Sequence, residues 1–152
     1  MVVAEIHLEI PSRVAEEFKT AAKRAWPREA FAYLLGQDAG SEIAVEELYF
    51  PDGVDQHCTE DAVYAPPHWE IEARLYAQEA GLSVVGDIHS HPRRYSMWFG
   101  SRSDRAPSEN DHESGWRGIA GVCVVTEQKS GRLYARAPKF YSTSIPVKAR
   151  MV

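Results

Sequence analysis

Residues 82–91, LSVVGDIHSH, place an apolar run directly before two histidines, and Pro92 follows at once. Valine and isoleucine favour strands, and a proline cannot donate the next ladder hydrogen bond, so we expect a buried strand that ends at residue 91. Side chains two positions apart in a strand project from the same face. His89 and His91 are therefore predicted to present two imidazoles together at the end of a sheet.

Further strand-like segments are spread along the whole chain. Apolar alternation and short apolar runs predict strands at residues 4–10, 29–36, 42–50, 118–127, 131–137 and 139–147. The turn-forming sequence QDAGS lies between the second and third of these segments, which predicts a hairpin. The last two segments are expected to finish the sheet.

Two longer helices and one short helix are predicted between these strands. The first should begin at a Ser12 cap, bury a face that includes Val14 and Phe18, and end at Pro27. The second should begin near residues 66–67, where proline suits a first helical turn, and end at Gly81. Its apolar face is expected to consist of Ile71, Ala73, Leu75 and Ala80. The alternation of strands and helices favours an α/β or α+β fold, in which helices flank a mixed central sheet.

Length and composition limit the class of protein. A chain of 152 residues, 44% apolar and 26% charged, is expected to form a single globular domain over residues 1–152. A net charge of −5 argues against general binding to nucleic acid or to an anionic membrane. The N-terminus has no basic region typical of a signal peptide, and no apolar run reaches membrane-spanning length. Cys58 and Cys123 form no Cys-x-x-Cys pair, so we expect a cytoplasmic protein with reduced cysteines.

A carboxylate that follows the histidines in the sequence makes a metal site at the histidine pair more plausible. In APSEND, Ser108 is a helix-cap residue, and Asp111 lies in the first turn that follows it. On its own this pattern indicates a plain capped helix. Combined with His89 and His91, Asp111 would complete a set of three ligands that leaves the fourth position of Zn²⁺ open, which is typical of catalytic zinc. These ligand types leave Fe²⁺ and Mn²⁺ open as alternatives.

Hydrolysis at such a centre also needs a general base. Glu29 opens the apolar segment 29–36 and is a candidate, although a carboxylate there could equally be solvent-exposed. The spacing does not place Glu29 near residue 89.

The set Glu29, His89-Ser-His91-Pro92, Ser108 and Asp111 resembles the motif of the JAB/MPN (JAMM) metalloproteases, and the resemblance covers roughly residues 3–135. By this resemblance His89, His91 and Asp111 are the zinc ligands. Glu29 is the general base, and Ser108 donates a hydrogen bond to the oxyanion. The resemblance also implies the JAB/MPN fold.

The sequence departs from the motif at one place. Sixteen residues separate His91 from Ser108, whereas the family has seven. The longer loop offers Ser101 and Asp104 at the same Ser-x-x-Asp spacing, and we prefer Ser108 and Asp111 because Pro107 and Ser108 make a better helix start. The loop also holds four large apolar residues, which either pack on the domain itself or contact a substrate or a second copy: Tyr95, Met97, Trp98 and Phe99.

The resemblance implies a zinc-dependent peptidase or isopeptidase that cleaves after the C-terminal tail of ubiquitin or a ubiquitin-like protein. The chain is similar to stand-alone prokaryotic-type members, some of which process sulfur-carrier proteins instead. Hydrolysis of a small-molecule or peptide amide, and a non-catalytic scaffold of the same fold, remain alternatives. Asp-x-His-x-His also occurs in barrel-type amidohydrolases, but only 61 residues follow His91, too few for a barrel. The sequence leaves the oligomeric state open.

Overall fold

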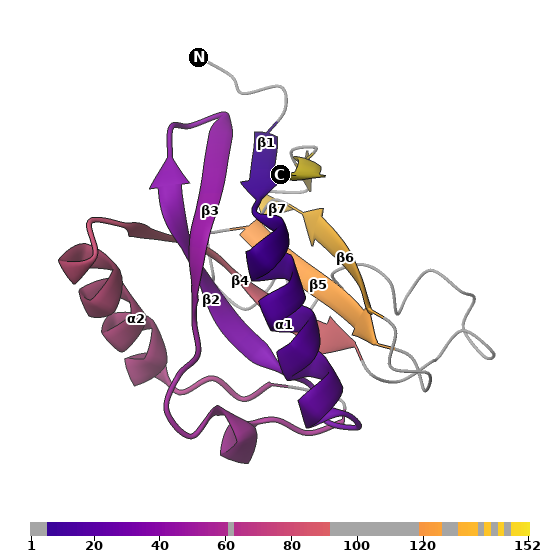
Figure 1. Cartoon of the computed structure of the whole chain (residues 1–152). Helices are drawn as coiled ribbons and strands as arrows, with labels where there is room; N and C mark the ends of the chain where they lie inside the picture. Colours follow the sequence, from indigo (N-terminus) through magenta and orange to yellow (C-terminus); the bar gives the residue numbers. More distant parts are fainter. Residues whose placement is uncertain are drawn as a thin grey trace.

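The computed structural model describes residues 6–60, 63–91, 119–125, 131–136, 139–140, 143–144 and 147–152. Within them lies a seven-stranded sheet of order β6-β5-β4-β2-β3-β1-β9, which Figure 1 shows between two helices. Its strands are β1 (Ile6–Ile10), β2 (Phe31–Asp38), β3 (Glu42–Tyr49), β4 (Ser83–His91), β5 (Ile119–Val125), β6 (Gly131–Arg136) and β9 (Val147–Met151).

The sheet is mixed, as the sequence predicted. The pairs β1–β3, β1–β9 and β4–β5 are parallel, and the pairs β2–β3, β2–β4 and β5–β6 are antiparallel. The edge strands β6 and β9 also contact each other, so the sheet is curled. This arrangement is not the eight-stranded parallel barrel of the rival amidohydrolases.

The predicted hairpin is present as β2 and β3. Asp38 and Gly40 form its turn, in which the Asp38 carboxylate accepts a hydrogen bond from the backbone N–H of Gly40 at 2.8 Å. Gly36 lies at a register shift in the pair, and a side chain there would meet the carbonyl oxygen of Ala44 at 1.9 Å. Glycine is therefore required for the two strands to approach at this point.

The helix α1 (Ser12–Ala25) covers one face of the sheet and is strongly amphipathic. Its buried residues are Val14, Ala15, Phe18, Ala22 and Ala25. They pack against aliphatic side chains of β1, β2, β3 and β4. Phe18 is 0% exposed and stacks near Phe50, with ring centroids 6.5 Å apart. The predicted apolar face of this helix is confirmed in its main residues.

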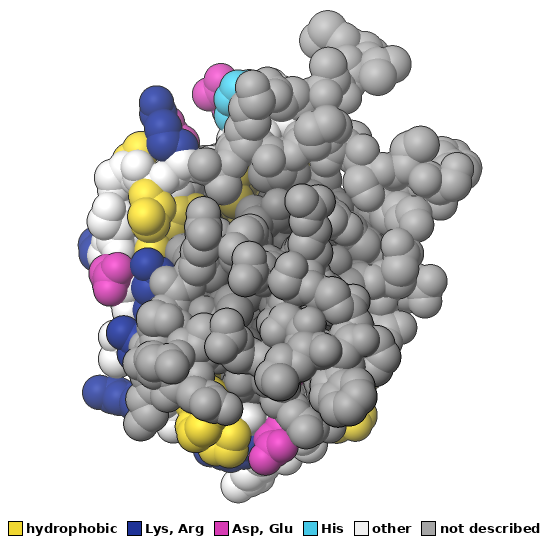
Figure 2. All heavy atoms as spheres, turned by 90° about the vertical axis from the view of Figure 1, so that its right-hand side faces the viewer, with side chains coloured by type: hydrophobic (Ala, Val, Ile, Leu, Met, Phe, Trp, Pro, Cys, Tyr) yellow, Lys and Arg dark blue, Asp and Glu magenta, His cyan; other side chains and the backbone are white. Residues whose placement is uncertain are grey.

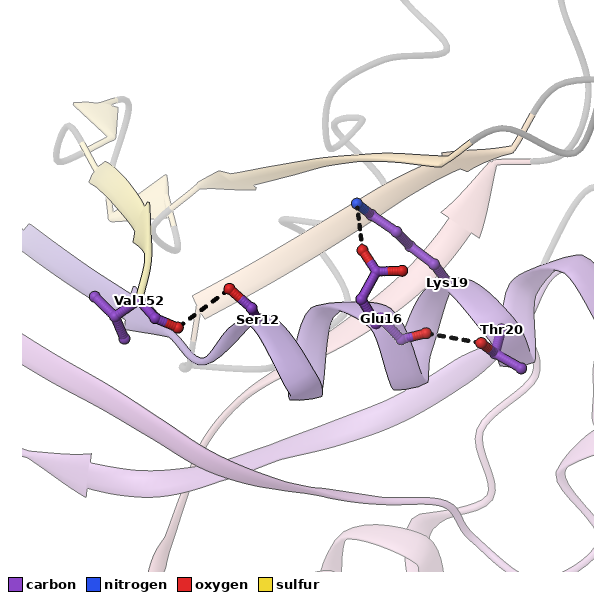
Figure 3. Close-up of polar contacts among 5 residues, drawn as sticks. All are labelled: Ser12, Glu16, Lys19, Thr20 and Val152. Carbon is purple, nitrogen blue, oxygen red and sulfur yellow. Dashed lines mark hydrogen bonds and ion pairs between the residues drawn. The ribbon is translucent and has the colours of Figure 1, made fainter.

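The predicted Ser12 cap is wrong. Ser12 is the first helical residue, and its hydroxyl donates to the carbonyl oxygen of Val152 at 3.2 Å rather than accepting from its own helix. Figure 3 shows this bond beside the contacts of Glu16, whose carboxylate binds Lys19 and whose carbonyl accepts from Thr20. The start of α1 is thus tied to the C-terminal end of the described chain, a contact that local spacing cannot predict.

The helix α2 (Pro67–Glu79) covers the other face, and the predicted apolar face of this helix is wrong except for Ala73. The buried residues are Trp69, Ala73 and Ala77, whereas Ile71 and Leu75 are exposed. Residues 69, 73 and 77 follow one another at four-residue intervals, so they form one face of the helix, and Ile71 and Leu75 lie on the opposite side. The face that carries Trp69, the largest side chain of the helix, is the one that turns inward.

The end of the chain differs in part from the prediction. Of residues 139–147, β7 (Lys139–Phe140) and β8 (Thr143–Ser144) pair only with each other as a separate two-stranded sheet. The following β9 joins the main sheet beside β1. A short 3-10 helix, η1 (Val54–His57), precedes α2. In the part of the chain that the structure describes, no helix is long and apolar enough to cross a membrane.

Candidate functional site

The strands β2 and β4 bring Glu29, His89 and the backbone of His91 to one end of the sheet. The two strands are antiparallel, so the start of β2 lies beside the end of β4. Phe31, the first residue of β2, pairs with His89, and β4 ends at His91 as predicted. His89 is only 7% exposed. The strand pairing therefore continues to the end of β4 that carries the two histidines.

Glu29 reaches this end of the sheet from the residues that lead into β2. Continuing the register of Phe31 and His89 by two residues places the backbone of Glu29 opposite that of His91. The Glu29 side chain is 7% exposed, and its backbone N–H donates to the carbonyl oxygen of Thr59 at 2.7 Å. The tertiary fold therefore makes the connection between Glu29 and the histidines that spacing alone could not make.

Ser90, between the two histidines, holds the two strands together. Its hydroxyl accepts the backbone N–H of Ala30 at 2.7 Å, and its own N–H donates to the Ala30 carbonyl at 3.1 Å. Ser90 is 0% exposed. No sequence motif marks Ser90 as a site residue. Strand alternation turns its side chain away from the face of His89, where a buried hydroxyl needs a hydrogen-bond partner. This bond fixes the backbone next to both Glu29 and His89.

Aromatic side chains line the α2 face of the sheet beneath His89. The Phe31 ring meets the Tyr33 ring edge-on at 5.0 Å and stacks with Trp69 of α2 at 5.7 Å. Trp69 in turn contacts the ring of His57 at 5.1 Å. These contacts place an apolar wall next to a buried carboxylate and a buried imidazole. Such a wall strengthens electrostatic interactions at the site because it lowers the local dielectric.

Cys58 lies in the same cluster, where its thiol is inert. Burial, followed by the charges of Glu29 and Asp55, raises the pKa of Cys58 to about 11. The thiolate is the form that attacks carbonyls and binds metals, and it is scarce at neutral pH with such a pKa. Cys58 therefore does not fit a catalytic nucleophile. Burial likewise raises the pKa of Tyr33 on this face, with a further contribution from Asp87.

The described residues fit a zinc site in part. A buried imidazole and a buried carboxylate lie at one end of two paired strands, and the backbone of β4 carries the second histidine to the same end. No three His, Cys, Asp or Glu side chains converge among those that the structure describes. The side chain of His91 and the residues Ser108, Asp111 and Asp104 lie outside that part, so the complete ligand set remains a prediction. The same holds for Tyr95, Met97, Trp98 and Phe99.

A cavity of about 600 Å³ lies elsewhere in the molecule. Its lining residues include Glu9 of β1, Gln37 at the end of β2, Glu42 at the start of β3 and Arg150 of β9. Figure 2 shows the side of the molecule turned toward β6, where acidic and basic side chains both occur along the margin of the described surface. The cavity does not belong to the site at the β2–β4 end.

Comparison with protein families gives one match that spans most of the chain. The model described as prokaryotic homologs of the JAB domain matches residues 11–137. The match includes β2, β4 and the segment between them, and therefore Glu29 and both histidines.

Two solved structures share the fold of this chain with TM-scores above 0.5, and a third matches it less closely. A protein of Desulfitobacterium hafniense superposes with a TM-score of 0.66 at 18% identity, covering 95% of this chain and 94% of that one. A protein of Salinibacter ruber gives a TM-score of 0.53 at 24% identity, over 85% and 80% of the two chains. A JAB1/MPN domain protein of Archaeoglobus fulgidus is 19% identical over 95% and 96%, with a TM-score of 0.47.

Proposed function

Because the chain belongs to the family of prokaryotic JAB-domain proteins and has the JAB/MPN fold, we propose that it is a zinc-dependent peptidase or isopeptidase. Its substrate is the amide bond after the C-terminal tail of ubiquitin or a ubiquitin-like protein. One observation carries the proposal: Glu29 and His89 are both buried at the end where β2 meets β4. A buried carboxylate and imidazole are costly to the fold unless they are paired, and they are typical of functional sites.

The proposed zinc ligands are His89, His91 and Asp111. Bound zinc supplies Lewis acidity, which lowers the pKa of a water and polarises the scissile carbonyl. Three protein ligands leave room for water and substrate, as in other catalytic zinc sites. In this proposal Asp104 takes the place of Asp111 only if the helix start lies at Ser101.

Glu29 is the proposed general base. Its carboxylate takes a proton from the attacking water and returns it to the leaving amine, while the Ser108 hydroxyl donates to the oxyanion. The hydrogen bonds from Glu29 N–H to Thr59 and from Ala30 N–H to Ser90 hold the backbone on both sides of the Glu29 Cα. These hydrogen bonds keep the Glu29 carboxylate at a fixed distance from the reacting atoms. Such positioning of a catalytic group raises the reaction rate.

The proposed substrate segment is an extended tail, because a narrow approach to the metal favours residues without bulky side chains. The apolar loop residues Tyr95, Met97, Trp98 and Phe99 are proposed contacts for this tail or for the body of the substrate protein.

The test is cleavage of a lysine conjugate of a ubiquitin-like protein, with zinc content measured on the same samples. We expect Glu29→Gln to keep its zinc and to lose at least about 100-fold in rate, because it removes the base but no ligand. His89→Ala should lose both zinc and activity. Glu42→Gln is the matched control, since Glu42 is an exposed glutamate at the start of β3.

Cleavage that survives both a chelator and Glu29→Gln would contradict the mechanism. A zinc-free, inactive wild type would indicate a scaffold. If only a short peptide amide is hydrolysed, with the same dependence on Glu29 and metal, the chemistry holds and the ubiquitin-like substrate is wrong.

A further inference from the structure

The outer side of α2 carries an apolar stripe that the fold does not use. Ile71 is 60% exposed and Leu75 is 57% exposed, and they lie four residues apart on the side opposite Trp69, Ala73 and Ala77. His68 and Gln78 extend the same line in both directions, and both are exposed. Figure 1 shows α2 at the periphery of the molecule, with the sheet on only one side of it.

The spacing of this stripe suits one kind of partner surface. Residues 68, 71, 75 and 78 repeat at alternating intervals of three and four, which is the seam that a second helix packs against in a coiled coil. A single exposed leucine needs no explanation, but two large apolar residues on adjacent turns of one face make a continuous patch. Tyr64, 64% exposed just before the helix, adds a further exposed ring at its N-terminal side.

The charges beside the stripe are acidic on one flank and neutralised on the other. Glu72 and Glu79 follow Ile71 and Gln78 on the first flank, and no hydrogen bond or ion pair among the described residues involves either carboxylate. On the second flank, the Arg74 guanidinium donates to the Glu70 carboxylate at 2.8 and 3.1 Å. A partner therefore meets an apolar seam with unpaired negative charge along one edge.

A second copy of this chain does not complement that pattern. If α2 packs antiparallel on its own copy, the two-fold axis brings each flank against the same flank of the other helix. Glu72 and Glu79 then oppose their own copies, and Arg74 opposes its copy. In a parallel pair Arg74 can reach Glu79 of the copy only by giving up its ion pair with Glu70, and Glu72 still faces no basic side chain of the copy.

We propose that the stripe of Ile71 and Leu75 on α2 docks an amphipathic helix of another protein, whose apolar seam is flanked by lysine or arginine opposite Glu72 and Glu79. Apolar contact supplies most of the affinity, and the basic flank selects the partner and its orientation. This docking surface lies on α2 itself and does not depend on zinc or on the hydrolytic activity proposed above.

The probe is a synthetic two-heptad peptide with leucine at the seam positions and lysine on the flanks. Its control is the same peptide with glutamate on the flanks. With fluorescence anisotropy at low salt, we expect the lysine peptide to bind at least about tenfold more tightly than the glutamate peptide. The double variant Ile71→Ser/Leu75→Ser should lose this binding. Glu72→Lys/Glu79→Lys should reverse the preference, which a merely structural effect of the substitutions would not do.

Equal binding of both peptides, no binding of the lysine peptide, or binding unaffected by Ile71→Ser/Leu75→Ser would overturn the proposal. Sedimentation of the free protein gives a second check. A dimer that dissociates in the Ile71→Ser/Leu75→Ser variant would make the occupant a second copy, and the proposal would be wrong. Circular dichroism verifies that both double variants are folded before either result is used.

Discussion

The two faces of the sheet are covered by helices that differ in what they bury. Under α1 the fully buried side chains are aliphatic apart from Phe18, with Trp26 and Phe50 packed at the edge of the cluster, and the helix turns its polar residues outward. Under α2 the cluster contains Phe31, Tyr33, Trp69 and the Cys58 thiol, and it adjoins His89 and Glu29. The α2 helix also keeps two large apolar residues on its outer side.

The difference indicates that one face of the sheet mainly stabilises the fold and the other forms the candidate site. The α1 face buries the larger cluster of apolar side chains, so we expect it to provide most of the stability. The α2 face places aromatic rings beside ionisable groups next to the candidate site. Substitutions on the two faces should therefore differ in their effect on stability and activity. The four predictions below test this difference, beginning with the largest expected effect.

Phe18→Ala should lower the free energy of unfolding by about 3–5 kcal/mol, because it leaves a cavity in the fully buried core under α1. Urea denaturation followed by circular dichroism measures the change. A loss of less than about 1 kcal/mol would mean that the α1 core collapses onto the cavity, and the contrast between the faces would not hold.

Ser90→Ala should cost about 1–3 kcal/mol, because the Ala30 N–H would be left buried without its acceptor. The substitution acts where the two strands carry Glu29 and His89, so hydrolysis should fall by more than the loss of folded protein explains. Denaturation and rate are measured on the same preparation, and Ser90→Thr, which retains a hydroxyl, is the control. Unchanged stability would show that the backbone finds another acceptor.

The pH dependence of folding stability tests the burial of Cys58 on the α2 face. Its pKa of about 11 in the folded protein lies above the ordinary value of 9.0, so the folded state keeps a proton that the unfolded state loses first. The thiol's contribution to stability is fully present below about pH 9 and is lost as the pH rises toward about 11. The stability advantage of wild type over Cys58→Ala should shrink by about 1 kcal/mol between about pH 8 and pH 10. A constant difference would place the thiol in contact with water.

Ile71→Ser/Leu75→Ser should have the smallest effect on folding. Both side chains project away from the core, and surface substitutions of this kind usually change the free energy of unfolding by less than about 0.5 kcal/mol each. Ala73→Ser is the informative counterpart, because Ala73 is fully buried in the same helix. If the exposed pair proved as costly as the buried alanine, the inner and outer sides of α2 would have been assigned wrongly.

Local pattern was enough for most of the elements. Apolar alternation located β1, β2, β3 and β4, and the sequence QDAGS identified the hairpin, because these signals depend only on neighbouring residues. The two helices were also located, but their details were less well predicted. The hydroxyl of Ser12 bonds to Val152, and Trp69 turned Ile71 and Leu75 outward. The first outcome depends on a residue that is distant in the chain. The second depends on which of two apolar sides of α2 packs against the sheet.

The sequence by itself determined that two histidines would end a strand, because valine and isoleucine favour a strand and the proline that follows cannot continue the hydrogen-bond ladder. Only the tertiary structure decided what lies beside them. The antiparallel pairing of β2 with β4 brings Glu29 across from residue 91, and the Ser90 hydroxyl fixes that approach. Sequence distance says nothing about which strands become neighbours, since that choice is made by burying the apolar faces of all the strands at once.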